Sequence, residues 1–350
     1  MRRKKVFIVG AGASKEFDLP TGMELVKRIE QAASGSDRGF EGYTPSDTVV
    51  AGALGYIASD LNQFSKNDIF DGLLAIKNNM GLAPSIDNFL EAHSDKLPWA
   101  LAGKVAIARC ILQAEARSPL KFDNSNIHNR PEFFRLGSNW LSRVFQTLVA
   151  QRKQEDFFNA LKTCHFITFN YDRIIEQFFH QAIKSYFQLS SSEVDERCRD
   201  ALNVLHVYGH LGDVNCQTAG DFGGRSDDSQ YLARAAQGIR TFSEGVSDPR
   251  RMQIAKAWID NSDVVAFLGF GFLPLNLEAL APSSGEMYKV NEVIGTSLGL
   301  STPNRNIVED ILKGQWFGWE YKNLNLLPKK GFELIEDYSY FLSEFDLKTK

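Results

Sequence analysis

Cysteine is scarce in this chain of 350 residues, and its four cysteines are isolated from one another. No two of them form a C-x-x-C pair, which excludes a zinc ribbon and argues against a disulfide framework. We therefore expect no metal site. The cysteines are Cys110, Cys164, Cys198 and Cys216.

Long hydrophobic runs and basic patches are also missing. No apolar stretch approaches the roughly 20 residues of a membrane helix, and the start of the chain lacks the order of charged, apolar and small residues of a signal peptide. The formal net charge is −4, and the one basic run, residues 2–5, directly precedes an apolar segment. We expect a cytoplasmic protein without membrane contact and without a nucleic-acid footprint.

Several short runs of β-branched or aromatic residues do occur, and each ends abruptly in glycine or asparagine. Such runs are typical of buried parallel strands. An apolar face at helical spacing follows the second run, over residues 172–183. Strand followed by helix, repeated, predicts an α/β fold with a Rossmann-like parallel sheet. The runs are residues 5–9, 164–168, 204–208, 264–268 and 289–294.

The segment 34–163 has no comparable strand signal and carries long helical apolar patterns. We predict one domain, 1–350, with a core of 1–33 and 164–350 and a large helical insertion at 34–163. The segment 212–250 is irregular and rich in Asp, Gly and Ser. This composition predicts a long surface loop, which either acts as a lid over the site or has no function of its own. The helical patterns are residues 49–64, 97–117 and 131–162.

The first strand ends in the glycine loop Gly10-Ala-Gly12-Ala-Ser14. Gly10 permits a tight turn, and Gly12 lets the backbone approach a pyrophosphate held by amide groups at a helix start. A dinucleotide fingerprint has a third glycine where this chain has Lys15. The loop indicates nucleotide binding, but not of the ordinary Rossmann type. The alternative is a glycine turn that binds no ligand.

The helix after this loop is predicted to break at Pro20. Thr21 and Glu24 have the spacing of a capping box, and an apolar stripe follows them. A second helix is therefore predicted from about Gly22.

Polar residues follow the second strand in the segment Thr168-Phe-Asn170-Tyr-Asp172. Open α/β sheets bind ligands at this carboxyl edge. Asn170 or Asp172 could instead cap the following helix, because both residue types favour that position.

The third strand ends in His206-Val-Tyr208-Gly209-His210. Strand alternation predicts that His206 and Tyr208 share a face, with His210 just past the turn. Metal binding by the two histidines is disfavoured, because no acidic or thiol cluster accompanies them.

Taken in order along the chain, these motifs resemble the Sir2-like proteins, especially the bacterial group found in antiphage defence. The segment 168–172 stands where sirtuins have T-Q-N-x-D, and Phe267-Leu-Gly269-Phe-Gly271-Phe stands where they have a glycine-serine ribose loop. The glycine loop, the histidine-glycine turn and the segment 85–90 complete the match, which covers residues 6 to about 276.

Two departures from the sirtuin pattern weaken a protein-deacylase function, and a further one concerns the catalytic histidine. The chain lacks the two C-x-x-C pairs, and Thr21-Gly-Met replaces the Asp-Phe-Arg that follows the loop proline. Tyr208 occupies the place before the glycine where sirtuins have their catalytic histidine. His206 is therefore the first candidate for that role and His210 the second.

The resemblance implies a Sir2-like NAD hydrolase that releases nicotinamide and ADP-ribose, with NAD as substrate and no metal. Asn170 would position water or the ribose, His206 or His210 would accept a proton, and Asp172 would orient or balance charge. Further residues would line the nucleotide. These are Gly10, Ala11, Gly12, Ser14, Thr168, Gly209, Gly269, Gly271 and Asn276.

By the same resemblance, the protein would deplete NAD during phage infection as a homo-oligomer, within a larger assembly. The alternative is a regulatory or scaffold subunit that binds NAD or ADP-ribose without turnover and acts with a HerA-like ATPase. A dehydrogenase is disfavoured, because the third glycine is missing and no strand with an acidic end follows soon after the loop.

Overall fold

The computed structural model describes residues 2–37, 42–122, 132–212, 222–246, 248–281, 290–318, 321 and 323–343. The predicted strand start at Lys289, Cys216, and residues 213–221 and 247 of the predicted irregular stretch lie outside the described residues.

Six parallel strands form the central sheet, in the order β5-β4-β1-β6-β7-β8. The chain begins at the middle strand, moves outward to β5, and then crosses to β6 on the other side of β1. This is the doubly wound order of dinucleotide-binding folds. The strands are β1 (Lys5–Val9), β4 (Cys164–Thr168), β5 (Asn203–His206), β6 (Val264–Leu268), β7 (Glu292–Thr296) and β8 (Leu324–Leu327).

The α/β prediction with a Rossmann-like parallel sheet is confirmed. β1, β4 and β6 have the predicted bounds, because their runs are apolar on both faces and end at polar or glycine residues. β5 ends two residues before the predicted Tyr208, and β7 extends past the predicted end at Ile294. β8, an edge strand of four residues, was not predicted from the sequence.

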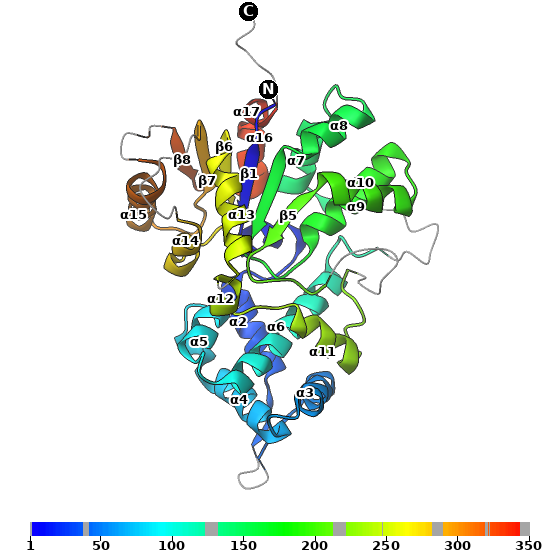
Figure 1. Ribbon diagram of the computed structural model, residues 1–350, viewed down its shortest axis with the longest axis vertical. Helices are drawn as coiled ribbons and strands as arrows, with labels where there is room; N and C mark the ends of the chain where they lie inside the picture. Colours follow the sequence, from blue (N-terminus) through cyan, green and yellow to red (C-terminus); the bar gives the residue numbers. More distant parts are fainter. Residues whose placement is uncertain are drawn as a thin grey trace, which may run out of the picture.

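Alternate side chains of each strand enter two separate cores. In β1, Phe7 and Val9 pack into one core, and Val6 and Ile8 pack into the other. Helices cover both faces and give a three-layer structure (Figure 1). The core of Phe7 and Val9 is closed by α7 (Trp140–Val149), α8 (Gln154–Leu161), α9 (Ile174–Phe187), α10 (Ser191–Ala201), α16 (Gly331–Asp337) and α17 (Ser339–Leu342).

The opposite face is covered partly by α13 (Pro249–Asp260), α14 (Pro274–Leu280), α15 (Thr302–Ile311) and η5 (Leu312–Phe317). A separate group of helices lies beyond the carboxyl ends of the strands (Figure 1). This group, here called the helical lobe, comprises α2 (Gly22–Ala32), α3 (Thr48–Leu61), α4 (Lys66–Asn79), α5 (Ile86–Ala92), α6 (Leu97–Arg117), α11 (Ser229–Gln237) and α12 (Phe242–Val246).

The helical patterns predicted within 34–163 are present, but their helices divide between two places. Those of 49–64 and 97–117 form α3 and α6 in the lobe, whereas that of 131–162 forms α7 and α8 against the sheet. A small antiparallel pair, β2 (Gly35–Asp37) and β3 (Tyr43–Pro45), also lies in this segment. The division of the chain at residues 34 and 163 stays a prediction.

The described part of 212–250 is largely helical, so the predicted irregular loop is wrong there. It forms α11, α12 and the start of α13. Leu232, Ala233 and Ala236 bury one face of α11, which packs on α3 and α6. The composition of the whole segment is polar, so the short apolar face of α11 was not recognised as a helix signal.

The predicted helix break after the glycine loop is confirmed. α1 (Ala11–Ser14) passes into η1 (Lys15–Phe17), and Asp18 then takes a left-handed conformation with φ 64°. Thr21 and Glu24 form the predicted capping box at the start of α2. Among the described residues, no helix has both the length and the apolar character to cross a bilayer.

Candidate functional site

The candidate site lies at the carboxyl edge of the sheet, where the chain switches direction between β1 and β6. Ligands of open α/β sheets bind in the crevice at such a point. The helical lobe lies beyond this edge (Figure 1). All four strand ends that carry predicted site residues, those of β1, β4, β5 and β6, are neighbours here.

The two glycine loops at the switch point contact each other backbone to backbone. The Gly12 N–H donates to the Gly269 carbonyl over 2.9 Å. A Cβ on Gly10 would come within 2.6 Å of that same oxygen, and a Cβ on Gly269, whose φ is +55°, within 1.9 Å of the Ala13 nitrogen. Gly10, Gly12 and Gly269 are therefore required by this contact, whether or not a ligand is bound.

Three predicted nucleotide-binding residues at this crossing are accessible to a ligand. Gly12 and Gly271 are exposed, and Ala11 is half-buried. None of the residues that the structure describes comes within 4 Å of a Cβ placed on Gly271. The crossing thus offers backbone groups and open space to a phosphate, although α1 alone is too short to provide a strong helix dipole.

Next to this crossing, Ser14, Asn170 and Asp172 form a buried hydrogen-bonded triplet. The Asn170 amide donates to Ser14 Oγ over 2.8 Å, and Ser14 Oγ donates to Asp172 Oδ2 over 2.7 Å. Thr168 Oγ1 supports the triplet by accepting from the Asn170 backbone N–H at 3.1 Å. The structure therefore brings together four predicted residues, one from α1 and three from the end of β4 and the segment after it.

Asp172 is buried, with only 6% of the residue's surface exposed. Burial raises the pKa of Asp172 to about 7, and the hydrogen bond from Ser14 only partly offsets this effect. Asp172 also accepts a hydrogen bond from the Ile174 N–H at the start of α9, so the alternative role as a helix cap is present alongside the contact with Ser14.

His206 lies at the end of β5 with both ring nitrogens in contact with acceptors. Nδ1 lies 3.0 Å from the Asn170 carbonyl, and Nε2 lies 2.7 Å from Glu176 Oε1 on α9. Burial alone would lower the pKa of His206, but the Glu176 carboxylate outweighs it and the pKa is raised. The His210 ring lies beside that of His206, with centroids 4.7 Å apart.

The predicted shared face of His206 and Tyr208 is wrong. β5 ends at His206, so strand alternation does not extend to Tyr208. Tyr208 packs with Phe169 and Tyr171 in the core next to the helical lobe, whereas His206 turns toward α9.

Two predicted nucleotide-binding residues lie apart from the triplet. Asn276 Oδ1 accepts a hydrogen bond from the Tyr208 hydroxyl. The Tyr171 ring packs near that of Tyr208, and the Tyr171 hydroxyl donates to Asp87 of α5. Gly209 has φ +71°, and its Cβ position is filled by the Gly238 carbonyl. Gly209 is therefore explained by a backbone contact with the end of α11.

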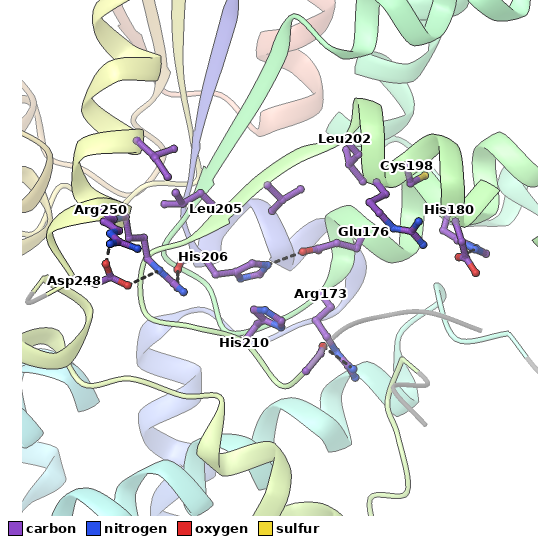
Figure 2. A pocket seen from close by; sticks show the side chains of 16 residues that line it. Arg173, Glu176, His180, Cys198, Leu202, Leu205, His206, His210, Asp248 and Arg250 are labelled. Carbon is purple, nitrogen blue, oxygen red and sulfur yellow. Dashed lines mark hydrogen bonds and ion pairs between the residues drawn. The ribbon is translucent and has the colours of Figure 1, made fainter. Parts of the chain in front are cut away.

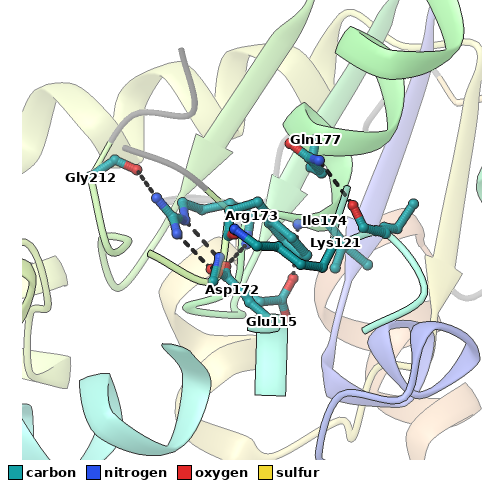
Figure 3. Close-up of polar contacts among 10 residues, drawn as sticks. Glu115, Lys121, Asp172, Arg173, Ile174, Gln177 and Gly212 are labelled. Carbon is teal, nitrogen blue, oxygen red and sulfur yellow. Dashed lines mark hydrogen bonds and ion pairs between the residues drawn. The ribbon is translucent and has the colours of Figure 1, made fainter. Parts of the chain in front are cut away.

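Two charged contacts of the site were missed by sequence reasoning. Glu176, the partner of His206, stands on the predicted helix that follows Asp172, and this proximity was the signal available. Arg173 and Glu115 form an ion pair of 2.5 Å, with side chains 1% and 0% exposed. Figure 3 shows Arg173 between Glu115 of α6 and the Gly212 carbonyl. No sequence signal linked residues so far apart.

A pocket of about 700 Å³ opens on the outer side of His206 (Figure 2). His210, Glu176 and Arg173 also line it. No group of three or more histidine, cysteine or acidic side chains placed to hold a metal ion occurs in the part of the chain that the structure describes.

No protein-family model and no curated protein matches this chain. A solved SIR2 homolog–NAD complex aligns with 97% of this chain and 90% of its own, at a TM-score of 0.35 and 12% identity. A mutant of Sir2 homologues with 2'-O-acetyl ADP ribose aligns with 99% and 94%, at a TM-score of 0.34 and 14% identity. At such scores neither alignment decides the family of this chain.

Proposed function

We propose that this protein is a Sir2-like enzyme that cleaves the bond between nicotinamide and ribose in NAD. The observation that carries the proposal is the convergence of Ser14, Asn170, Asp172 and His206 beside the glycine crossing. Four strand ends supply, at one edge, the backbone groups for phosphates and the polar side chains for a ribose.

The reaction needs no general acid for the leaving group, because the positively charged pyridinium departs as neutral nicotinamide. The site has to stabilise positive charge on the ribose and direct a nucleophile. In its ionised form, Asp172 would oppose that charge, and Asn170 would orient a hydroxyl or water through its amide. The loop of Gly10, Ala11, Gly12 and Ser14 would hold the phosphates.

Proton transfer is assigned to His206, with Glu176 holding its ring. The Glu176 carboxylate favours the protonated form, so His206 would accept a proton most readily above its raised pKa. His210 lies beside His206 and is the second candidate. Thr168, Gly269 and Gly271 would complete the walls, and Asn276 would contact the adenosine side only if Tyr208 released it.

The direct test is incubation of the purified chain with NAD, with separation of nicotinamide and ADP-ribose. Wild type is expected to consume NAD, and Asn170→Ala to lose activity about 100-fold, the size of effect typical for one stabilising polar group. Equal consumption by wild type and variant would contradict the proposed site. Formation of a cyclic product instead of ADP-ribose would reassign the nucleophile.

One observation favours a second function, a subunit that binds NAD or ADP-ribose without turnover. Both ring nitrogens of His206 are engaged, by the Asn170 carbonyl and by Glu176. A ring held in this way could take a substrate proton only after one of these two contacts opened. Purified protein containing unhydrolysed nucleotide in stoichiometric amount, with no NAD consumption, would favour this function, and a HerA-like ATPase would then be the partner to test.

We further propose, from the motif resemblance, that NAD cleavage serves antiphage defence in the cytoplasm and that the chain acts as a homo-oligomer. Infection of cells carrying wild type or Asn170→Ala, with NAD measured through the infection, tests the first point. Light scattering of the full chain, alone and with a candidate partner, tests the second.

A further inference from the structure

The segment 170–173, between β4 and α9, carries two of the proposed site residues but belongs to neither a helix nor a strand. A ladder of backbone hydrogen bonds therefore does not fix its shape. The Asn170 N–H donates instead to Thr168 Oγ1 at 3.1 Å. The Arg173 N–H donates to Glu115 Oε1 at 3.0 Å. Contacts with side chains thus decide how this segment lies.

The side chains of the segment alternate between two surroundings. Asn170 and Asp172 both contact Ser14 in the buried triplet. Tyr171 and Arg173 turn instead to the helical lobe, where each contacts a carboxylate, one on α5 and one on α6. Figure 3 shows the contact of Arg173 with the carboxylate on α6. The lobe therefore holds the residues on both sides of Asp172.

The carboxylate on α5 belongs to Asp87, within the segment 85–90 of the Sir2-like resemblance, for which the proposed reaction has no role. Ser85 Oγ accepts from the Asn88 N–H at 3.1 Å and so starts α5 just before Asp87. α5 is fixed in turn within the lobe, because Glu91 accepts a hydrogen bond from the start of α12. Asp87 is thus an acceptor on an anchored helix.

Tyr171 is the donor in the contact with Asp87. Burial and the nearby Asp87 carboxylate hold the pKa of Tyr171 well above its ordinary value, so the hydroxyl keeps its proton. Only 4% of Tyr171 is exposed, and a buried hydroxyl that lost its acceptor would be left unsatisfied. The bond therefore fixes the Tyr171 side chain, and with it the backbone between Asn170 and Asp172.

We propose that Asp87 is a positioning residue, which holds the buried triplet in its working geometry through the Tyr171 hydroxyl. This inference rests on the proposed function, cleavage of NAD. Among the described hydrogen bonds, the Asp87 carboxylate contacts Tyr171 and no member of the triplet. Misplacement of a reacting group by about 1 Å can cost about 100-fold in rate. Loss of the bond should therefore lower turnover, whereas the glycine crossing would still bind NAD.

Steady-state NAD cleavage by the full chain separates turnover from binding. Asp87→Ala and Tyr171→Phe are each expected to lower kcat about 10-fold or more, with KM changed by less than about 3-fold. Because both changes remove the same bond, Asp87→Ala/Tyr171→Phe should lose no more than either single variant. Asp87→Asn should keep most of the activity, since its amide oxygen still accepts from the Tyr171 hydroxyl.

Tyr43→Phe is the matched control. Tyr43, which packs beside α4 of the lobe, is also buried and donates its hydroxyl to the Ala33 carbonyl. Tyr43→Phe should keep the kcat of wild type even where its stability falls. An equal loss of kcat in Tyr43→Phe and Tyr171→Phe, or in Asp87→Asn and Asp87→Ala, would overturn the positioning role.

A wild-type chain that consumes no NAD would contradict the proposed function alone. The positioning role is then tested by the carboxyl carbon resonance of Asp172, followed by NMR over pH. Asp87→Ala should lower the pKa of Asp172 below about 7, because a loosened segment admits water to a carboxyl group whose pKa burial raises. Asp87→Asn should leave this pKa unchanged. An unchanged pKa of Asp172 in Asp87→Ala would overturn the positioning role.

Discussion

At the residue scale, the contact between His206 and Glu176 sets the charge of the proposed proton acceptor. Glu176→Gln removes the carboxylate that favours protonation, while burial of the ring remains, so the pKa of His206 should fall. Imidazole nitrogen shifts followed by NMR over pH measure this value. His180, whose partner is Asp195, is an internal reference that should not change. An unchanged titration of His206 would show that Glu176 does not control it.

Asp172 makes stability depend on pH in the opposite sense to an ordinary surface aspartate. The folded chain keeps the Asp172 proton up to about pH 7, whereas an unfolded aspartate loses it near pH 4. Between these values the folded state binds more protons, so the free energy of unfolding should fall as pH rises, by up to about 4 kcal/mol. Urea unfolding at several pH values tests this.

Asp172→Asn should remove that dependence, because asparagine cannot titrate and can still accept from Ser14. The difference in unfolding free energy between variant and wild type should therefore shift in favour of the variant as pH rises from 4 to 8, roughly spanning the two pKa values. A constant difference over this range would show that Asp172 ionises normally in the fold.

At the element scale, the crossing between the β1 and β6 loops depends on one glycine far more than on another. Gly269→Ala would place a Cβ against the Ala13 backbone at positive φ, so we expect a loss of about 2 kcal/mol or more. Gly271→Ala meets open space and should change stability by about 0.5 kcal/mol or less. Similar unfolding midpoints for the two variants would contradict the crossing.

The Glu115 and Arg173 pair joins α6 of the lobe to the segment that carries Asp172. Glu115→Gln leaves a buried guanidinium uncompensated and should cost about 3 to 5 kcal/mol. Replacing both side chains, as in Glu115→Gln/Arg173→Met, should cost less than the two single changes together. The exposed pair of Arg197 and Glu155 is the control, with about 1 kcal/mol or less expected. Additive costs in denaturant unfolding would exclude the coupling.

Elements with a strong local signal were predictable. The runs at β1, β4 and β6 are apolar on both faces, and Thr21 and Glu24 specify the start of α2 by local hydrogen bonds. β8 and α11 were missed, because a four-residue edge strand and a short helix in a polar segment carry weak periodicity. Their place is decided by packing against residues distant in sequence.

At the scale of the whole molecule, the sheet order explains which site residues the sequence could bring together. Parallel strands end at one edge, so Ser14, Asn170, Asp172 and His206 were expected near each other, and the hydrogen bonds confirm that proximity. Which way each side chain turns beyond its strand was not predictable, because alternation ends with the strand. Tyr208 turns toward the lobe for this reason, and its contact with Asn276 links the lobe side to α14.

Nicotinamide release from NAD, followed by proton NMR, is the most direct test of cleavage at this edge of the sheet. Wild type, Asn170→Ala and Asn203→Ala form the comparison, because Asn203 lies at the opposite end of β5 and contacts only the Lys162 carbonyl among the described side-chain bonds. Wild type and Asn203→Ala are expected to release nicotinamide at similar rates, and Asn170→Ala to release almost none. Release that is equal in all three proteins, or absent from wild type under every activating condition, would contradict a cleavage site at the carboxyl edge of this sheet.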